Sequence, residues 1–126
     1  MKYTPIDPPR VFAVGRGSAI QLKDCGRIEL QPDEQVTFLT NAGAEYDVVR
    51  KSWGFYATPS LNRRLVRFGL RAVLVKSVDG TFYVMLVEQE KEAMFQQYLK
   101  SEGQQVVCWL DGREPLDALT RRGDGA

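Results

Sequence analysis

Residues 70–88, LRAVLVKSVDGTFYVMLVE, give the clearest indication of structure in the chain, a β-hairpin. Two apolar runs flank Asp79-Gly80, a pair that favours a two-residue β-turn because both residues tolerate a positive φ. That turn places Arg71 opposite Glu88, so two opposite charges face each other across the hairpin. Both faces of the hairpin are mostly apolar. We therefore expect it to lie at the centre of a sheet, covered on each side.

The chain after the hairpin predicts one helix and one last strand. Residues 90–102 carry acidic side chains in the first turn and an apolar stripe, and Gly103 is a typical C-cap. The stripe consists of Met94, Phe95, Tyr98 and Leu99. Residues 105–110 predict the strand. We expect a single α+β domain over residues 1–111 and a partly disordered tail over 112–126, where bulky apolar residues are scarce.

The chain before the hairpin predicts a β-meander. Polar and apolar residues alternate over 20–23, 27–30 and 35–38, with turn residues between these segments. Residues 45–58 predict a further extended stretch, interrupted at Gly54. Ser60 favours the start of a short helix near 60–68. Together these elements predict an α+β fold with a largely antiparallel sheet of six to eight strands.

Composition excludes several classes of function. The 126 residues contain no histidine, which rules out Ser-His-Asp and Cys-His catalysis and histidine metal sites within one chain. Two distant cysteines are too few for a cysteine-only zinc site. We expect no cofactor and no metal. The first residues lack the apolar core of a signal peptide and no run is long enough to cross a membrane, so we expect a cytoplasmic protein without a membrane partner.

The strongest departure from the average composition lies between Val48 and Val78. This interval holds seven basic residues and no acidic residue, although the net charge of the chain is only +1. The basic residues are Arg50, Lys51, Arg63, Arg64, Arg67, Arg71 and Lys76, and the aromatic ones are Trp53, Phe55, Tyr56 and Phe68.

One interpretation of this interval is a site for an anionic, phosphate-bearing ligand. Guanidinium groups make forked contacts with phosphate and aromatic rings stack on bases or sugars. The candidate ligand-binding residues are Trp53, Tyr56, Ser60, Asn62, Arg63, Arg64 and Arg67. The alternative is a solvated helix face whose arginines pair with carboxylates such as Glu29, Asp33, Glu34 or Glu45, with the aromatic residues in the core. No catalytic residue is singled out.

The segment EYDVVRKSWGFYATPSLNRRLVRFGLRAVLVKS resembles a group of small uncharacterised bacterial proteins. QPDEQVTF before it, and FYVMLVE and VVCWLD after it, belong to the same pattern, which covers about residues 20–111. Such proteins are encoded among genes for surface-polysaccharide and nucleotide-sugar synthesis. The resemblance implies a cytoplasmic accessory role in glycan assembly and supplies no catalytic residues.

Four functions follow from these patterns. The first is a non-enzymatic binding or accessory protein for an anionic small molecule or a protein partner. The second is a small enzyme that acts on a nucleotide sugar without histidine or metal. The third is a single-stranded RNA-binding module, which is less favoured because the total charge of the chain is nearly neutral. The fourth is protein interaction through an exposed strand edge. The sequence leaves the ligand and the oligomeric state open.

Overall fold

The computed structural model describes residues 1–124 and confirms an α+β fold in which antiparallel strands dominate. Eight strands form three sheets, of two, three and three strands, where the sequence predicts one larger sheet. The chain forms two compact units. Unit 1 comprises residues 1–36 and 48–58, and unit 2 comprises residues 37–47 and the chain from Pro59 onward.

Unit 1 contains a long antiparallel ribbon of β1 (Lys2–Val14) and β2 (Ile20–Glu29), joined through a short 3-10 helix at Arg16–Ser18. The sequence predicts a turn at residues 24–26, between two alternating segments. This prediction is wrong, because β2 continues through these residues. Gly26 lies opposite Pro5, and a Cβ there would come within 2.8 Å of the Thr4 carbonyl oxygen. This glycine therefore permits a close approach of two strands and does not mark a turn.

The sheet β3-β4-β5 consists of β3 (Gln35–Leu39), β4 (Glu45–Lys51) and β5 (Gly54–Ala57). The strand at 35–38 is confirmed. The extended stretch at 45–58 is a hairpin, with Lys51 opposite Gly54 and Trp53 in the connecting turn. Arg50 lies opposite Phe55, so their side chains share one face of this hairpin.

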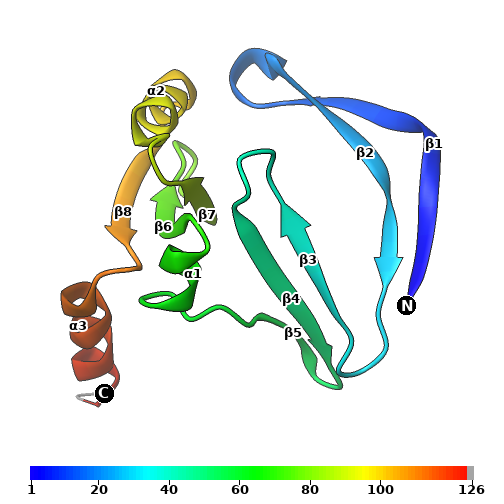
Figure 1. Ribbon diagram of the computed structural model, residues 1–126. Helices are drawn as coiled ribbons and strands as arrows, with labels where there is room; N and C mark the ends of the chain where they lie inside the picture. The colour runs from blue at the N-terminus through cyan, green and yellow to red at the C-terminus, as the bar shows by residue number, and fades with distance from the viewer. Residues whose placement is uncertain (125–126) are drawn as a thin grey trace. The chain divides into compact units, whose positions relative to one another are not determined.

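Unit 2 is built on the sheet β7-β6-β8, formed by β6 (Leu70–Lys76), β7 (Phe82–Glu88) and β8 (Gln105–Trp109). Figure 1 shows β6 between its two neighbours. One buried cluster comprises Val73, Val75, Val87 and Leu99. The other comprises Ala44, Leu65, Leu70 and Ala72. The apolar residues of β6 contribute to both clusters, so the central, covered position predicted for the hairpin is confirmed for β6. It is wrong for β7, which lies at the edge of the sheet and exposes Phe82 and Val84.

The register of the β6–β7 hairpin differs from the prediction by one residue. Arg71 lies opposite Val87, not Glu88. The loop has three residues instead of two, because the Gly80 N–H donates to the Ser77 carbonyl and only Gly80, at φ 87°, adopts a positive φ. This is the pattern of a type I turn followed by a left-handed glycine, which Asp-Gly accommodates as readily as the tighter turn.

The helices agree with the sequence except at the C-terminus. Helix α2 (Glu92–Glu102) ends at Gly103, which adopts the predicted left-handed conformation with φ 67°. The short helix near 60–68 is the four-residue α1 (Arg64–Arg67). A third helix, α3 (Arg113–Asp124), occupies the stretch where we expected a partly disordered tail. Residues 125–126 of that expected tail lie outside the described residues.

Candidate anion-binding site

The two aromatic residues of the predicted site lie together in unit 1. The rings of Trp53 and Tyr56 stack with centroids 6.0 Å apart and an angle of 15° between their planes. The relative exposure of Trp53 is 71% and that of Tyr56 is 47%. These rings are therefore accessible to a ligand and are not part of the core, contrary to the structural alternative considered for them.

The polar residues Ser60 and Asn62 of the predicted site lie in unit 2. The Ser60 hydroxyl accepts a hydrogen bond from the backbone N–H of Arg64 at 3.0 Å, at the start of α1. Ser60 therefore supports the turn that precedes α1, but it is not the N-cap of that helix: this position is Arg63, which makes no side-chain capping hydrogen bond. Asn62 is exposed and lines a small cavity with Arg63 and Asp111.

The three arginines of the predicted site have different surroundings in unit 2. Arg64 lies 3.7 Å from the buried carboxylate of Asp47 and stacks over the Phe68 ring. Arg63 lines the cavity beside Asp111, and Arg67 lines another that includes Glu88 and Glu90. A helix of four residues points successive side chains in different directions. The structure thus brings Trp53 and Tyr56 together but gives each arginine a separate environment.

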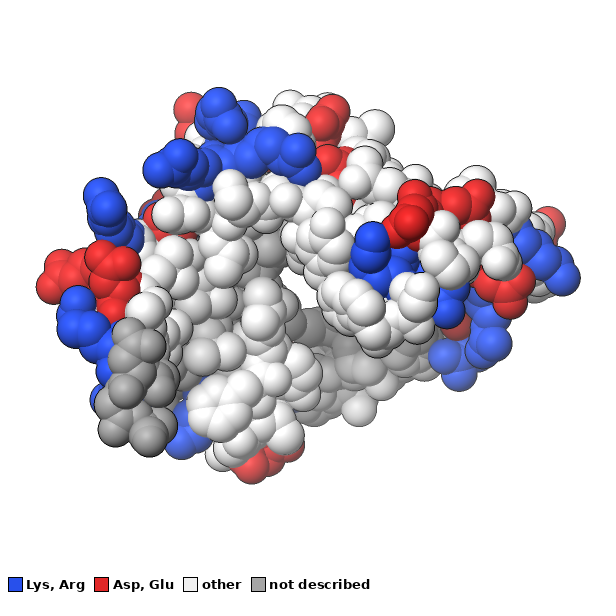
Figure 2. Space-filling model, turned by 90° about the horizontal axis from the view of Figure 1, so that it is seen from below, with Lys and Arg blue, Asp and Glu red and all other residues white. Residues whose placement is uncertain are grey.

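Several basic residues of the 48–78 interval are neutralised by carboxylates. Lys51 pairs with Asp33 at 2.5 Å, and this contact raises the pKa of Lys51. Arg71 pairs with Asp111 and Glu92. Basic and acidic side chains adjoin one another at several places on the face shown in Figure 2. Within residues 1–124, no ion pair involves Arg63 or Arg67. The salt-bridge interpretation therefore describes part of the interval.

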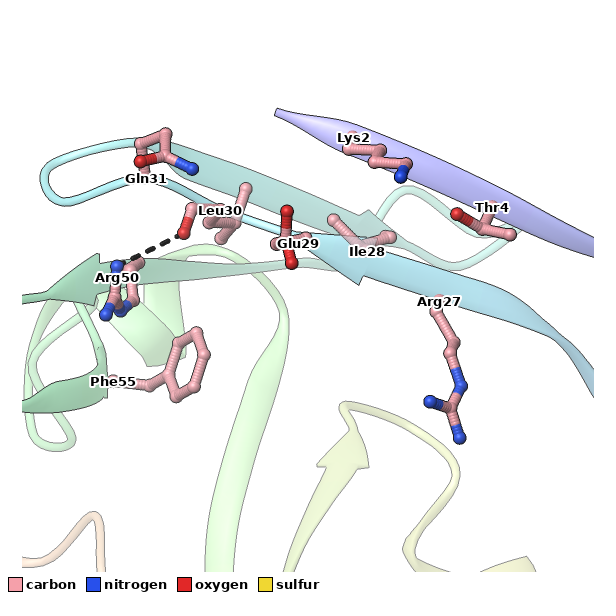
Figure 3. Close-up of a pocket in the computed structure, with 9 residues that line it drawn as sticks. All are labelled: Lys2, Thr4, Arg27, Ile28, Glu29, Leu30, Gln31, Arg50 and Phe55. Carbon is pink, nitrogen blue, oxygen red and sulfur yellow. Dashed lines mark hydrogen bonds between the residues drawn. The ribbon is translucent and has the colours of Figure 1, made fainter.

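Unit 1 contains a cavity of about 750 Å³ that the sequence does not reveal (Figure 3). Strands β1, β2, β4 and β5 all contribute to its wall, and we call it the ribbon pocket. Its lining residues are Lys2, Thr4, Arg27, Ile28, Glu29, Leu30, Gln31, Arg50 and Phe55.

Cations outnumber carboxylates in the ribbon pocket. The pocket is lined by three cationic residues, Lys2, Arg27 and Arg50, and by one carboxylate residue, Glu29. An Arg50 guanidinium N–H donates to the Leu30 carbonyl oxygen at 3.3 Å, which fixes one end of this side chain. Phe55 is 61% exposed and offers its ring to the solvent. The pocket thus combines an excess of positive charge with an accessible aromatic surface.

Strand pairing explains why these residues meet. Thr4 lies opposite Arg27 across the β1–β2 ribbon, and Arg50 lies opposite Phe55 across the β4–β5 hairpin. Figure 3 shows the Arg27 side chain and the Phe55 ring on the same side of β2. Arg50 and Phe55 belong to the basic interval of residues 48–78, whereas Lys2 and Arg27 lie outside it and were not among the predicted site residues. No local signal could have indicated them, because their place in the pocket depends on pairing between distant segments.

The chemistry of the ribbon pocket is that of anion recognition. Guanidinium groups donate paired N–H bonds to phosphate or carboxylate oxygens, and an ammonium group adds a point charge. Among the residues that the structure describes, no cluster of three or more Cys, Asp or Glu could hold a metal ion. The same part of the chain contains no helix with the length and apolar character of a membrane span.

Comparisons with protein-family models, curated proteins and solved structures find no match to this chain. The chemistry of the residues and their geometry therefore carry the functional argument.

Proposed function

We propose that this protein is a non-enzymatic binding protein that holds an anionic, phosphate-bearing ligand in the ribbon pocket. The observation that carries the proposal is that three cationic residues, one carboxylate residue and the exposed Phe55 line the same cavity. A polar ligand with a planar or sugar moiety fits this combination, because phosphate oxygens meet the cations while the ring packs against the uncharged part.

Each residue has a distinct role in this proposal. Arg50, tethered to the Leu30 carbonyl, and Arg27 bind the phosphate oxygens. Lys2 adds long-range attraction, the Thr4 hydroxyl offers a neutral hydrogen bond and Phe55 stacks. The role of a glycan-synthesis accessory protein in the cytoplasm, implied by the resemblance, stays a prediction and would make a nucleotide sugar the natural ligand.

The other candidate functions have less support. An enzyme needs a general acid or base. The chain has no histidine, and Glu29 is the one carboxylate residue that lines the pocket, so an enzymatic function has less support. A single-stranded RNA module gains support from the exposed Trp53 and Tyr56 stack, but the net charge of +1 gives little attraction for a long polyanion. Salt dependence separates this last case, since RNA affinity falls steeply with added salt.

Binding to UDP-glucose, inorganic pyrophosphate and a short single-stranded RNA tests the proposal, by calorimetry and thermal shift. Replacing Arg27 and Arg50 together by Gln should weaken binding of UDP-glucose or pyrophosphate at least about tenfold, because charge-assisted hydrogen bonds contribute about 1.5–3 kcal/mol each. The matched control replaces Arg63 and Arg67 by Gln. These residues are exposed and outside the ion pairs of the described chain, so binding should stay unchanged.

The control also tests the site predicted from sequence. If the Arg63 and Arg67 variant loses binding while the Arg27 and Arg50 variant keeps it, the basic interval and not the ribbon pocket holds the ligand. Failure of the wild-type protein to bind any of the three probes would overturn the proposed function. Circular dichroism of both variants shows whether the loss of the Arg50 bond to Leu30 disturbs the fold.

A further inference from the structure

Strand β7 is an open edge of the unit 2 sheet. Within this unit it is hydrogen-bonded to β6 alone, with an unbroken seven-residue register from Phe82 to Glu88. Natural sheets protect such edges with proline, lysine, bulges or short strands. Residues 82–87 contain no proline and no charge, and the pairing with β6 has no bulge. Nothing within the strand prevents a further strand from pairing with it.

Apolar side chains next to this edge are exposed. The exposed fractions are 55% for Phe82, 49% for Tyr83 and 62% for Val84. On helix α2, the exposed fractions are 69% for Met94 and 42% for Tyr98. These two residues form half of the apolar stripe that the sequence predicts as the buried face of the helix. The other half is covered, since Leu99 is 3% exposed and Phe95 packs on the core.

The exposed half of the helix stripe borders a groove along β7. This cavity of about 540 Å³ runs between the strand and α2, and Met85, Met94, Phe95 and Tyr98 line most of it. Thr40 and the ion pair of Glu88 with Lys91 also contribute to its lining. Methionine and tyrosine are typical of protein interfaces, because one adapts its shape and the other combines apolar area with a hydroxyl group. The edge and the groove form a continuous surface with chemistry suited to a second apolar strand and helix.

We propose that a second copy of this chain docks on this surface through antiparallel β7–β7 pairing about a twofold axis. The axis, perpendicular to the sheet, continues the sheet across both copies and places the two α2 helices on the same face. Met94 and Tyr98 of each copy then cover their counterparts. An isologous contact requires a patch that is complementary to itself, and an uncharged apolar strand meets this condition.

The charges at the ends of β7 favour the antiparallel arrangement. Glu88 ends the strand, and Lys76, with its ammonium group 5.7 Å from the Phe82 ring centroid, lies beside the start. Antiparallel pairing turns the Glu88 end of each copy toward the Lys76 end of the other. Parallel pairing would instead place the two Lys76 ammonium groups at the same end, which is unfavourable. At the other end Lys91, 2.8 Å from the Glu88 carboxylate, already offsets the negative charge, so the contrast between the two arrangements comes from Lys76. Charge and the apolar pattern thus point to the same symmetric dimer.

Sedimentation velocity over a series of protein concentrations tests the proposal, with reductant present because Cys25 is an exposed free thiol. The wild-type chain should dimerise. Val84→Lys should raise the dimer dissociation constant at least about tenfold, since it places a solvated charge at the centre of the new pairing. The matched control is Val107→Lys, which introduces the same charge at a 48% exposed valine of β8, the opposite edge of the sheet. This control should dimerise like the wild type.

Amide hydrogen exchange provides a second readout that does not depend on a variant. Raising the wild-type concentration should slow exchange in β7 and leave exchange in β8 unchanged. A wild-type chain that stays monomeric, a dimer that tolerates Val84→Lys, or a dimer disrupted by Val107→Lys would each overturn the proposal. These outcomes are independent of ligand binding in the ribbon pocket, so the two proposals fail separately.

Discussion

Arg71 connects three elements of unit 2 through one guanidinium group. It donates to both carboxylate oxygens of Asp111, at 2.6 and 3.3 Å, and to Glu92 at the start of α2 at 2.5 Å. The guanidinium carbon also lies 4.1 Å from the centroid of the Trp109 ring. The hydrogen bonds that Arg71 donates to Asp111, and next the one that it donates to Glu92, raise the pKa of Arg71 above its ordinary value. This residue therefore stabilises the packing of β6, β8 and α2.

Arg71→Leu should lower the free energy of unfolding by about 2–3 kcal/mol. The Asp111 side chain is only 13% exposed, so the substitution leaves a largely buried carboxylate without its ion-pair partner. Urea unfolding followed by circular dichroism measures the change. Arg113→Leu is the control, since the ion pair of Arg113 with Asp117 is long at 3.8 Å and solvated, and its loss should cost less than about 0.5 kcal/mol. Equal effects for the two substitutions would contradict the role assigned to Arg71.

At the scale of elements, the β6–β7 loop shows how local chemistry sets a register. The Asp79 carboxylate accepts hydrogen bonds from the Ser77 and Thr81 hydroxyls. These contacts, Ser77 first, lower the pKa of Asp79 from 3.8 to about 2. They close a three-residue loop and shift the strand pairing by one residue. The predicted attraction between Arg71 and Glu88 was too weak to decide the register against this turn.

The loop predicts a measurable titration of Asp79. A lowered pKa in the folded state means that the carboxylate contributes stability above the unfolded value of 3.8, and that this contribution is lost as the pH falls toward 2. Carbon NMR of the Asp79 carboxyl group should give a midpoint near pH 2. Ser77→Ala should raise the midpoint toward 3.8, whereas the remote Thr120→Ala should not. A wild-type midpoint near 3.8 would show that the hydroxyl contacts are not formed in solution.

At the scale of the whole molecule, the two units have unequal cores. Among the residues that the structure describes, unit 1 contributes only Leu30 and Val49 to the buried apolar residues, and the others belong to unit 2. The β1–β2 ribbon contains no buried residue. Two-stranded ribbons have little stability of their own in water, because they bury little apolar surface. The stability of the chain therefore resides mainly in unit 2.

Hydrogen exchange followed by mass spectrometry should reveal this difference. Amides of β1 and β2 should exchange through local openings of low free energy, whereas amides of β6 should exchange only on global unfolding. Ligand bound in the ribbon pocket should slow exchange in β1 and β2 and leave β6 unchanged. Protection of the ribbon equal to that of β6 in the free protein would contradict the uneven distribution of stability.

Features that depend on residues close together in the chain could be predicted from the sequence. Gly103 ends α2 because a left-handed residue there costs glycine little, and Ser60 accepts a bond at the start of α1. Alternating apolar residues placed β3, and the two apolar runs around Asp79 placed β6 and β7. Helix α3 was not predicted, because residues 112–126 contain few bulky apolar side chains and their composition indicated disorder.

Contacts between residues far apart in the chain could not be predicted from the sequence. The continuity of β2 through Gly26, the partners of Arg71 and the gathering of Lys2, Arg27 and Arg50 all depend on pairing between segments far apart in the chain. Trp53 and Tyr56 lie close in sequence and their rings stack, whereas Arg63, Arg64 and Arg67 each have different surroundings that the sequence did not indicate. Local propensity acts over a few residues, but strand register follows from the sum of many cross-strand contacts.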